Sequence, residues 1–462
     1  MAVKVYKFGG ALLNKIEGFE QLKTIIANNI KSEKNTIIVV ISALQKTTSR
    51  LLKAAKTAEL QGETKAMIFI DEIFDYHFSV ANQIINEEKN RKQIISILEE
   101  NKSQIAKIIR GISITKELTP RTKDLVLSFG EILASNIATI FLSETFLVDK
   151  QLNIILFDIK NVLETDSNYG AAVPNIPATQ KKIEELLLPI IFTKTSNKNS
   201  NKIIVTQGFI ASNQANETTT MGYESSNLTA TILAGLTNAD EFIIWSDTEG
   251  IRQSDPKLST VHTPKLVEKI SYDFAEFLAY CGLKLIHPPM IKYLKMFNLE
   301  VVYKSGFVPD GDFSLITKDG DDKKYRFLIH NDNLTLYYKS AKTSNFNPEN
   351  FPHLDYFLRN HSNTIHISPA YNLYISSETS LSIENDLLAN GFEKIESVSS
   401  TTFIYSEDLE AIKLCADSYN STVQIYEIFI NSKKKTAFIL YKSDTENKFI
   451  ESTVKYFERV FG

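Results

Sequence analysis

Four polar stretches follow or interrupt apolar runs in this 462-residue chain, and the first is Lys7-Phe8-Gly9-Gly10, which ends the run at 3–8. Paired glycines let backbone N–H groups approach an anion closely, because no Cβ stands in the way. A lysine beside them can place its positive charge on phosphate oxygens. The pattern predicts either a phosphate site or a turn that ends a strand, and taken alone the turn is the more frequent structure.

The second and third stretches offer a helix start and a carboxylate. A buried strand is expected to end at Ser42 and a helix to begin near Thr48. Hydroxyl groups at a helix N-terminus serve as caps or help to bind an anion. Glu131 stands in an otherwise apolar helical pattern, SFGEILASN. Its carboxylate faces solvent, pairs with a lysine, or takes the ammonium group of an amino acid.

The fourth stretch runs from 205 to 288 and combines several short motifs. A threonine-rich TTTMG at 218–222 leads into a helical pattern, and an apolar run then ends in Ser246-Asp247. Asp255-Pro256-Lys257 and Lys284-Leu285-Ile286-His287-Pro288 follow. No single structural role predicts all of these together.

The elements that must position these residues alternate between strands and helices, which is typical of an α/β domain with a mainly parallel sheet. Right-handed crossovers in such a sheet give a three-layer αβα sandwich. Strands are expected at 3–8, 36–42, 153–158, 202–210, 241–247 and 299–305, and helices at 18–32, 49–60, 64–118, 123–145, 176–187, 226–236, 272–281 and 287–297.

The last third of the chain has a different character. Residues 311–325 are charged and rich in turn formers, which predicts a linker. Residues 326–462 contain shorter units in the order strand, helix, strand, strand, helix, strand, twice, and this order fits ferredoxin-like folds. The predicted domains are therefore 1–310, the linker 311–325, and 326–462.

Composition restricts the partners. Fifty-one lysines and arginines against 55 aspartates and glutamates give a net charge of −4, which argues against nucleic acid as a partner. The two cysteines, Cys281 and Cys415, lie in no metal-binding or redox spacing, so idle thiols in a reducing compartment are expected. The chain shows neither an apolar signal-peptide core nor a membrane-length apolar run. We therefore expect a cytoplasmic protein with no membrane partner.

Read together and in order, the motifs resemble the aspartokinases of the amino acid kinase family over about residues 3–310. The matching segments are KFGG at 7–10, Ser42 with Thr48, Gly130-Glu131, DIKNVLETDSNYGAA at 158–172 with Asp158, Thr165, Asp166 and Gly170, QGFI at 207–210, TTTMG, WSDTEGI at 245–251, DPK at 255–257 and ISYDFAEFLAYCGLKLIHP at 270–288.

The resemblance implies an ATP-dependent phosphorylation of the aspartate side-chain carboxylate, which gives an acyl phosphate. Positioning, fixed cations and Mg²⁺ dominate such transfers, and the ionised nucleophile needs no general base. No metal-ligating residue of the protein is implied. The implied catalytic positions are Lys7 and Asn227; the ATP positions are Lys7, Phe8, Gly9, Gly10, Ser246, Asp247, Arg252, Lys257, Lys284 and Leu285; the substrate positions are Ser42, Thr48, Glu131 and Tyr223.

The chain departs from the family pattern in the segment after TTTMG. Tyr223-Glu224-Ser225-Ser226-Asn227 stands where the family has Arg-Gly-Gly-Ser-Asp, and Ala11-Leu12 replaces Thr-Ser after KFGG. Two nucleotide-side positions also differ, since Lys257 replaces an arginine and Arg252 a tyrosine. Loss of a buried charged partner costs roughly 2–5 kcal/mol.

An alternative hypothesis is therefore that the protein is a weakened or inactive paralogue, with a different acceptor or a regulatory amino-acid-binding role. Lys46 is a candidate for supplying a compensating charge. The resemblance further implies tandem ACT domains in the tail and a homodimer formed through them.

Overall fold

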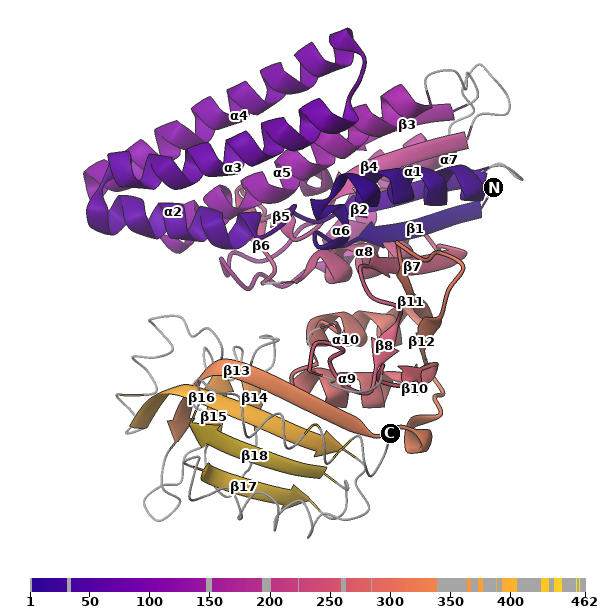
Figure 1. Cartoon of the computed structure of the whole chain (residues 1–462). Helices are drawn as coiled ribbons and strands as arrows, with labels where there is room; N and C mark the ends of the chain where they lie inside the picture. Colours follow the sequence, from indigo (N-terminus) through magenta and orange to yellow (C-terminus); the bar gives the residue numbers. More distant parts are fainter. Residues whose placement is uncertain are drawn as a thin grey trace. The chain divides into compact units, whose positions relative to one another are not determined.

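The computed structural model describes residues 2–30, 35–146, 152–192, 201–222, 224–258, 263–283 and 285–338, and in the tail 364–366, 373–376, 388, 393–404, 425–431, 436–442, 454 and 457 (Figure 1). The chain divides into two compact units. The first comprises residues 1–249 and 293–313, and the second residues 250–292 and 314–462.

A parallel sheet forms the centre of the first unit, with strand order β11-β7-β1-β2-β4-β3. Every residue of β2 is buried, because its continuous β-branched run is covered on both faces. The predicted parallel α/β sheet is confirmed. Its strands are β1 (Ala2–Phe8), β2 (Asn35–Ile41), β3 (Leu152–Phe157), β4 (Asn201–Gln207), β7 (Glu241–Ser246) and β11 (Val301–Ser305).

Helices flank this sheet (Figure 1). The long α5 (Pro120–Thr145) contacts β2, β3 and β4, while α8 (Ser226–Leu236) contacts β1, β2 and β7. Outside α5 lie α2 (Thr47–Gln61), α3 (Glu63–Ile84) and α4 (Glu88–Thr115). The helical stretch predicted at 64–118 is therefore two helices. The smaller elements of the unit are η1 (Leu12–Asn14), α1 (Ile16–Ile30), η2 (Ile159–Asn161), α6 (Ile176–Lys182), the π-helical η3 (Ile183–Leu187), α7 (Leu188–Phe192), β5 (Ile210–Ser212) and β6 (Thr218–Thr220).

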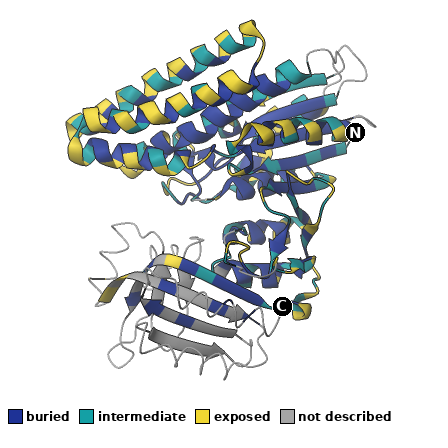
Figure 2. Ribbon diagram, viewed as in Figure 1, coloured by how far each residue is buried: buried dark blue, intermediate teal, exposed yellow. Residues whose placement is uncertain are grey.

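Helix α5 is the core helix of the unit. Thr119 caps its start by accepting a hydrogen bond from the Thr122 backbone N–H, and Pro120 occupies the first turn. Within the described residues it is the one helix long and apolar enough to cross a membrane. Most of it is instead buried against its neighbours (Figure 2). Its apolar character is thus explained by packing in the core.

The second unit contains an antiparallel six-stranded sheet with order β14-β15-β13-β16-β18-β17. β13 is one long strand, with shifts of register near Asn331 and Leu334. β12 lies in the predicted linker. The elements are β8 (Ile251–Arg252), β9 (Leu266–Val267), β10 (Lys269–Ser271), α9 (Tyr272–Tyr280), α10 (Pro288–Phe297, which continues into the first unit), β12 (Phe313–Thr317), η4 (Asp322–Lys324), β13 (Phe327–Tyr338), β14 (Thr364–His366), β15 (Leu373–Ser376), β16 (Glu393–Ile404), β17 (Ile425–Asn431) and β18 (Thr436–Lys442).

The tail helices predicted near 353–360, 379–391, 407–419 and 444–459 lie almost wholly outside the described residues, of which 388, 454 and 457 are helical. Cys415 also lies outside them, whereas Cys281 is a buried free thiol. The domain boundaries and the ACT assignment stay predictions.

Candidate active site

The carboxyl ends of β1, β2 and β7 meet at one edge of the parallel sheet, where ligands of open α/β sheets bind. Strand β1 lies between the other two, with Phe8 beside Ile41 and Trp245. Just past these ends stand Gly9-Gly10, Ser42 and Ser246-Asp247. The Ser42 backbone N–H donates to the Phe8 carbonyl at 3.3 Å, and that of Gly9 to the Trp245 carbonyl at 3.0 Å. The fold therefore brings the predicted motifs from all three strands together.

Lys7 is a half-buried cation at this edge. Burial lowers the pKa of its ammonium group to about 8, although the carboxylates of Glu224, Asp247 and Glu131 act in the opposite direction. Gly10 is required for close packing, since a Cβ at this position would lie 2.0 Å from the Ala43 carbonyl oxygen. The turn and the cation thus coexist in KFGG, and the two interpretations left open by the sequence do not exclude one another.

Glu131 is buried, with 3% of its surface exposed. One carboxylate oxygen, Oε1, accepts a hydrogen bond from the Ala43 backbone N–H at 3.2 Å, and Oε2 has no hydrogen-bond partner among the described residues. Burial raises the pKa of Glu131 to about 8, and the charge of Lys7 opposes this rise. Glu131 therefore does not face solvent, and no described residue uses the hydrogen-bonding capacity of its second oxygen.

The start of α2 packs against α5 beside Glu131. A Cβ on Gly130 would lie 2.8 Å from the Ala43 Cβ and 3.6 Å from the Thr48 hydroxyl oxygen. The hydroxyl of Ser42 is buried and has no hydrogen-bond partner among the described residues. Ser42, Thr48 and Glu131, three of the predicted substrate residues, consequently belong to one neighbourhood. Tyr223, the fourth, lies outside the described residues.

The segment after β6 contains two further buried polar atoms without partners in the described part of the chain: the Ser225 hydroxyl and the Asn227 side-chain oxygen. Buried polar groups in native proteins nearly always have a partner, so such orphans need an explanation. Glu224, between Gly222 and Ser225, interacts electrostatically with Lys7. Within the described residues, these atoms mark the start of α8 as a candidate binding position.

Glu224 also has a left-handed backbone, with φ of +64°. This conformation costs a residue with a Cβ roughly 1–2 kcal/mol, and glycine adopts it freely. We expect Glu224→Gly to be more stable than Glu224→Ala by about 0.5–1 kcal/mol once the unfolded-state entropy of glycine is deducted. Both variants lose the carboxylate, so urea unfolding of the pair isolates the backbone effect. Equal stabilities would contradict the strained conformation.

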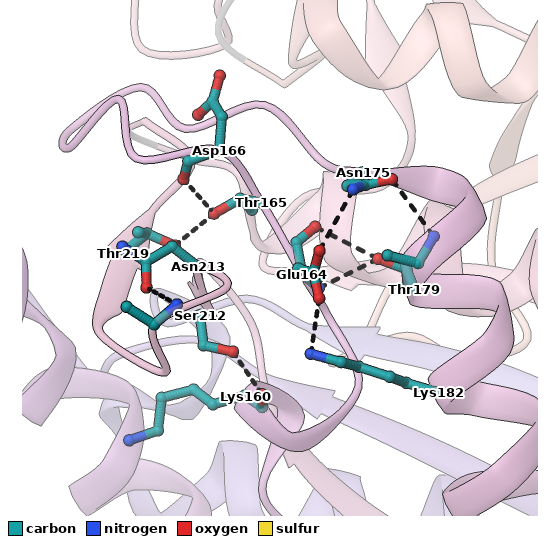
Figure 3. Close-up of polar contacts among 12 residues, drawn as sticks. Lys160, Glu164, Thr165, Asp166, Asn175, Thr179, Lys182, Ser212, Asn213 and Thr219 are labelled. Carbon is teal, nitrogen blue, oxygen red and sulfur yellow. Dashed lines mark hydrogen bonds and ion pairs between the residues drawn. The ribbon is translucent and has the colours of Figure 1, made fainter.

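The loop at 164–173 packs against the β5–β6 hairpin (Figure 3). The Thr165 and Thr219 hydroxyl oxygens lie 2.7 Å apart, and Asp166 Oδ1 accepts from the backbone N–H groups of Asn168 and Val173. At the start of this loop, the buried Glu164 forms an ion pair with Lys182 at 2.8 Å. Asp158 caps η2 through the Lys160 N–H at 3.0 Å. Asp158, Thr165 and Asp166 thus shape the backbone around the hairpin.

Residues predicted to hold ATP belong to both units. In the first unit, Asp247 is exposed, and the Ser246 hydroxyl accepts from the Thr248 N–H at 3.2 Å. The Phe8 ring is buried and stacked on Trp245, which leaves only its backbone for a ligand.

In the second unit, Arg252 donates from Nη1 to the Pro264 carbonyl at 3.4 Å. Lys257 is exposed and Leu285 half-buried. Lys284 lies outside the described residues, and the role of each residue in this set stays a prediction. Within the described ranges, no group of three or more His, Cys, Asp and Glu side chains is arranged to hold a metal ion.

Comparison with curated proteins identifies relatives of this chain. The chain is 28% identical over 306 residues to a bifunctional aspartokinase/homoserine dehydrogenase from Buchnera aphidicola, a match that covers 66% of this chain and 35% of that protein. It is 27% identical to chloroplastic aspartokinase 3 of Arabidopsis thaliana, over 69% of this chain and 54% of that one. The chain thus spans between about a third and about half the length of these curated relatives.

Among solved structures, that of E. coli aspartokinase III in complex with aspartate and ADP is similar over the full length of both chains, with a TM-score of 0.75 and 22% identity. At this identity the likeness establishes the fold. The model of the amino acid kinase family matches residues 2–304, the span that contains the sheet edge with Lys7, Glu131 and Asn227. The chain belongs to the amino acid kinase family.

Proposed function

We propose that this protein is an aspartate kinase, which transfers the γ-phosphoryl group of Mg·ATP to the side-chain carboxylate of aspartate. The observation that carries the proposal is Glu131, a buried carboxylate with one unbonded oxygen in the electrostatic neighbourhood of Lys7. A carboxylate in this position suits the ammonium group of an amino acid, and the lysine suits transferring phosphate oxygens. The curated relatives named above are themselves called aspartokinases.

In the proposed reaction, a side-chain oxygen of aspartate forms a bond to the γ-phosphorus while the bond from that phosphorus to the β,γ-bridging oxygen breaks. ADP leaves, and the product is an acyl phosphate. Lys7 stabilises the negative charge on the oxygens of the transferred phosphoryl group. Glu131 orients the acceptor by binding the ammonium group of aspartate. Asn227 contributes a buried amide oxygen at the start of α8. The nucleophile is ionised at neutral pH, so no residue has to act as a base.

Mg²⁺ would enter with the nucleotide and neutralise phosphate charge. Magnesium in such sites keeps several waters and binds one or two carboxylates plus substrate phosphates. Asp247, an exposed carboxylate at the end of β7, is the residue of this edge that suits the role.

Glu224 favours a second candidate function. Its negative charge stands at the edge where a dicarboxylic amino acid would have to bind. An acceptor amino acid with a single carboxylate fits this negative charge better than aspartate does. A protein that binds an amino acid without turning it over fits the charge better as well.

Release of ADP by the purified chain tests both candidates. We expect release from Mg·ATP that requires aspartate and saturates with it. The same assay is run with each of the twenty standard amino acids. If ADP release requires a different amino acid, that amino acid replaces aspartate as the proposed acceptor. ATP binding by calorimetry without release in any of these assays would favour the binding function.

We further propose that the protein is cytoplasmic, that it acts without nucleic acid or membrane partners, and that residues 326–462 are ACT-like domains that mediate a homodimer. The antiparallel sheet within this region supports the ACT-like assignment. Light scattering of the full chain gives the oligomeric state, and a monomer at all concentrations would contradict the dimer.

A further inference from the structure

The carboxylate of Asp124 joins three segments that are far apart in the sequence. Asp124 lies near the start of α5 and is fully buried. Its Oδ2 accepts hydrogen bonds from the backbone N–H groups of Gly170 and Thr220, both at 2.8 Å, and its Oδ1 accepts from the Thr220 hydroxyl, also at 2.8 Å. A single side chain therefore holds the loop at 164–173 and strand β6 against α5.

These segments lead to the residues proposed to bind the acceptor. Glu131 lies seven residues after Asp124 on α5, so the two side chains share one face of the helix. Thr220 is the last residue of β6, and Glu224 and then the start of α8 with Asn227 follow it. Because Thr220 also accepts from the Ala172 N–H at 3.0 Å, the loop and the strand are held as a pair.

A second, less buried contact set joins α5 and the loop at 164–173 to the hairpin just before β6. Glu217 accepts from Arg121 of α5 at 2.9 Å, from the Tyr169 hydroxyl, and from the Asn213 amide at 2.8 Å. Arg121 has 65% of its side chain exposed, and ion pairs this exposed contribute little. Both sets link α5 and the loop at 164–173 to the β5–β6 hairpin, and Arg121 is exposed where Asp124 is buried, which makes Arg121 a matched control for Asp124.

We propose that Asp124 is the positioning residue of the acceptor site, which sets the distance between Glu131 and residues 224–227 and thereby favours an amino acid as the ligand. This inference rests on the proposed function. A buried charge is costly unless it is fully hydrogen-bonded. Among the described residues, Asp124 meets that condition through Gly170 and Thr220, so the carboxylate fixes both segments.

The chemistry of asparagine allows a sharp test. An amide oxygen in the place of Oδ2 still accepts from both backbone N–H groups, and the amide NH₂ can donate to the Thr220 hydroxyl. Asp124→Asn is therefore expected to keep the KM for the acceptor within about threefold of wild type. Asp124→Ala is expected to raise it at least tenfold while the KM for ATP changes less than twofold. Arg121→Ala is expected to change neither constant more than twofold.

Two results would overturn the inference: equal rises of both KM values in Asp124→Ala, or a loss in Asp124→Asn as large as in the alanine variant. If Asp124→Ala does not fold, Thr220→Val removes one of the three hydrogen bonds. Its KM for the acceptor should rise several-fold, and an unchanged value would count against us.

Amide hydrogen exchange makes the test independent of turnover. Exchange at 166–173 and 218–222 should be at least tenfold faster in Asp124→Ala than in wild type and Arg121→Ala. Unchanged exchange overturns the inference even if the enzyme is active. Faster exchange in a chain whose wild type releases no ADP would overturn the aspartate kinase proposal and leave the structural role of Asp124 in place.

Discussion

Replacing Lys7 with alanine should reduce aspartate-dependent ADP release by about 10³-fold, because one preorganised group aimed at developing charge is worth about 10²–10³ in rate. The loss should appear in kcat, since the lysine acts on oxygens whose charge changes during transfer. The variant should fold. Burial already disfavours the charged form of Lys7, and its strand keeps its pairing with β2 and β7.

The strand offers its own control. Lys4 is also half-buried on β1, where it donates to Asn29 at 3.0 Å and pairs with Glu241 at 3.3 Å. It stands at the other end of the strand from the proposed site. We expect Lys4→Ala to keep kcat within about twofold of wild type. More than a tenth of wild-type turnover in Lys7→Ala, with an unchanged melting temperature, would exclude Lys7 from the transfer step.

The same group predicts a pH dependence. Burial brings the pKa of Lys7 down to about 8 from 10.5, so the free enzyme loses the charge as pH rises through 8. kcat/KM, which reports the free enzyme, should therefore fall on the alkaline side of pH 8. In the pH profile of kcat, the fall on the alkaline side should lie at higher pH than in that of kcat/KM, because bound phosphate favours the charged form of Lys7.

Much of the first unit could be predicted because its signals are local. The continuous β-branched run of β2 is explained by burial of the strand itself. The glycine pair after β1 is explained by close packing against the Ala43 backbone. Parallel pairing then brings strand ends to one edge whatever the details of the loops. The meeting of KFGG with Ser42 and Ser246 follows from that topology.

The contacts that complete the site are not local. Ala43 and Glu131 are 88 residues apart in sequence, and Asp124 is 96 residues from Thr220. Periodicity marks Asp124 as polar in an apolar helix but cannot name its partner. Likewise, the sequence shows a glutamate at 224 where glycine is usual in the family, but only the backbone shows that the position still requires a left-handed residue. Asp332 and Asn333 have low strand propensity, and β13 continues through them with a shift of register against β16 between Asn331 and Leu334.

Glu131→Gln should raise the KM for aspartate by about 10²-fold or more and leave the KM for ATP nearly unchanged. Loss of one partner of a desolvated charge pair costs roughly 2–5 kcal/mol, and each 1.4 kcal/mol is a factor of ten. The glutamine can still accept from the Ala43 N–H, so the helix contact survives. Glu144→Gln, near the other end of the same helix and partly exposed, is the control and should leave both constants unchanged.

Stability should respond to the same substitution in a defined pH window. Burial raises the pKa of Glu131 from 4.5 to about 8, so the protonated form is favoured by folding. The stabilisation from the protonated Glu131 side chain is complete below pH 4.5 and is lost as pH rises through 8. Glu131→Gln lacks this loss. The melting temperature of the variant should therefore rise relative to wild type between pH 5 and pH 8.

Binding of aspartate should also release a proton at pH 7. Without ligand most of the Glu131 population is protonated at this pH, because its pKa is about 8. An ammonium group at hydrogen-bonding distance favours the ionised form and lowers that pKa. Calorimetry in two buffers of different ionisation enthalpy measures the proton directly, and Glu131→Gln should abolish its release. If wild type binds aspartate without releasing a proton, Glu131 does not receive the ammonium group, and the acceptor must be held by other residues of this edge.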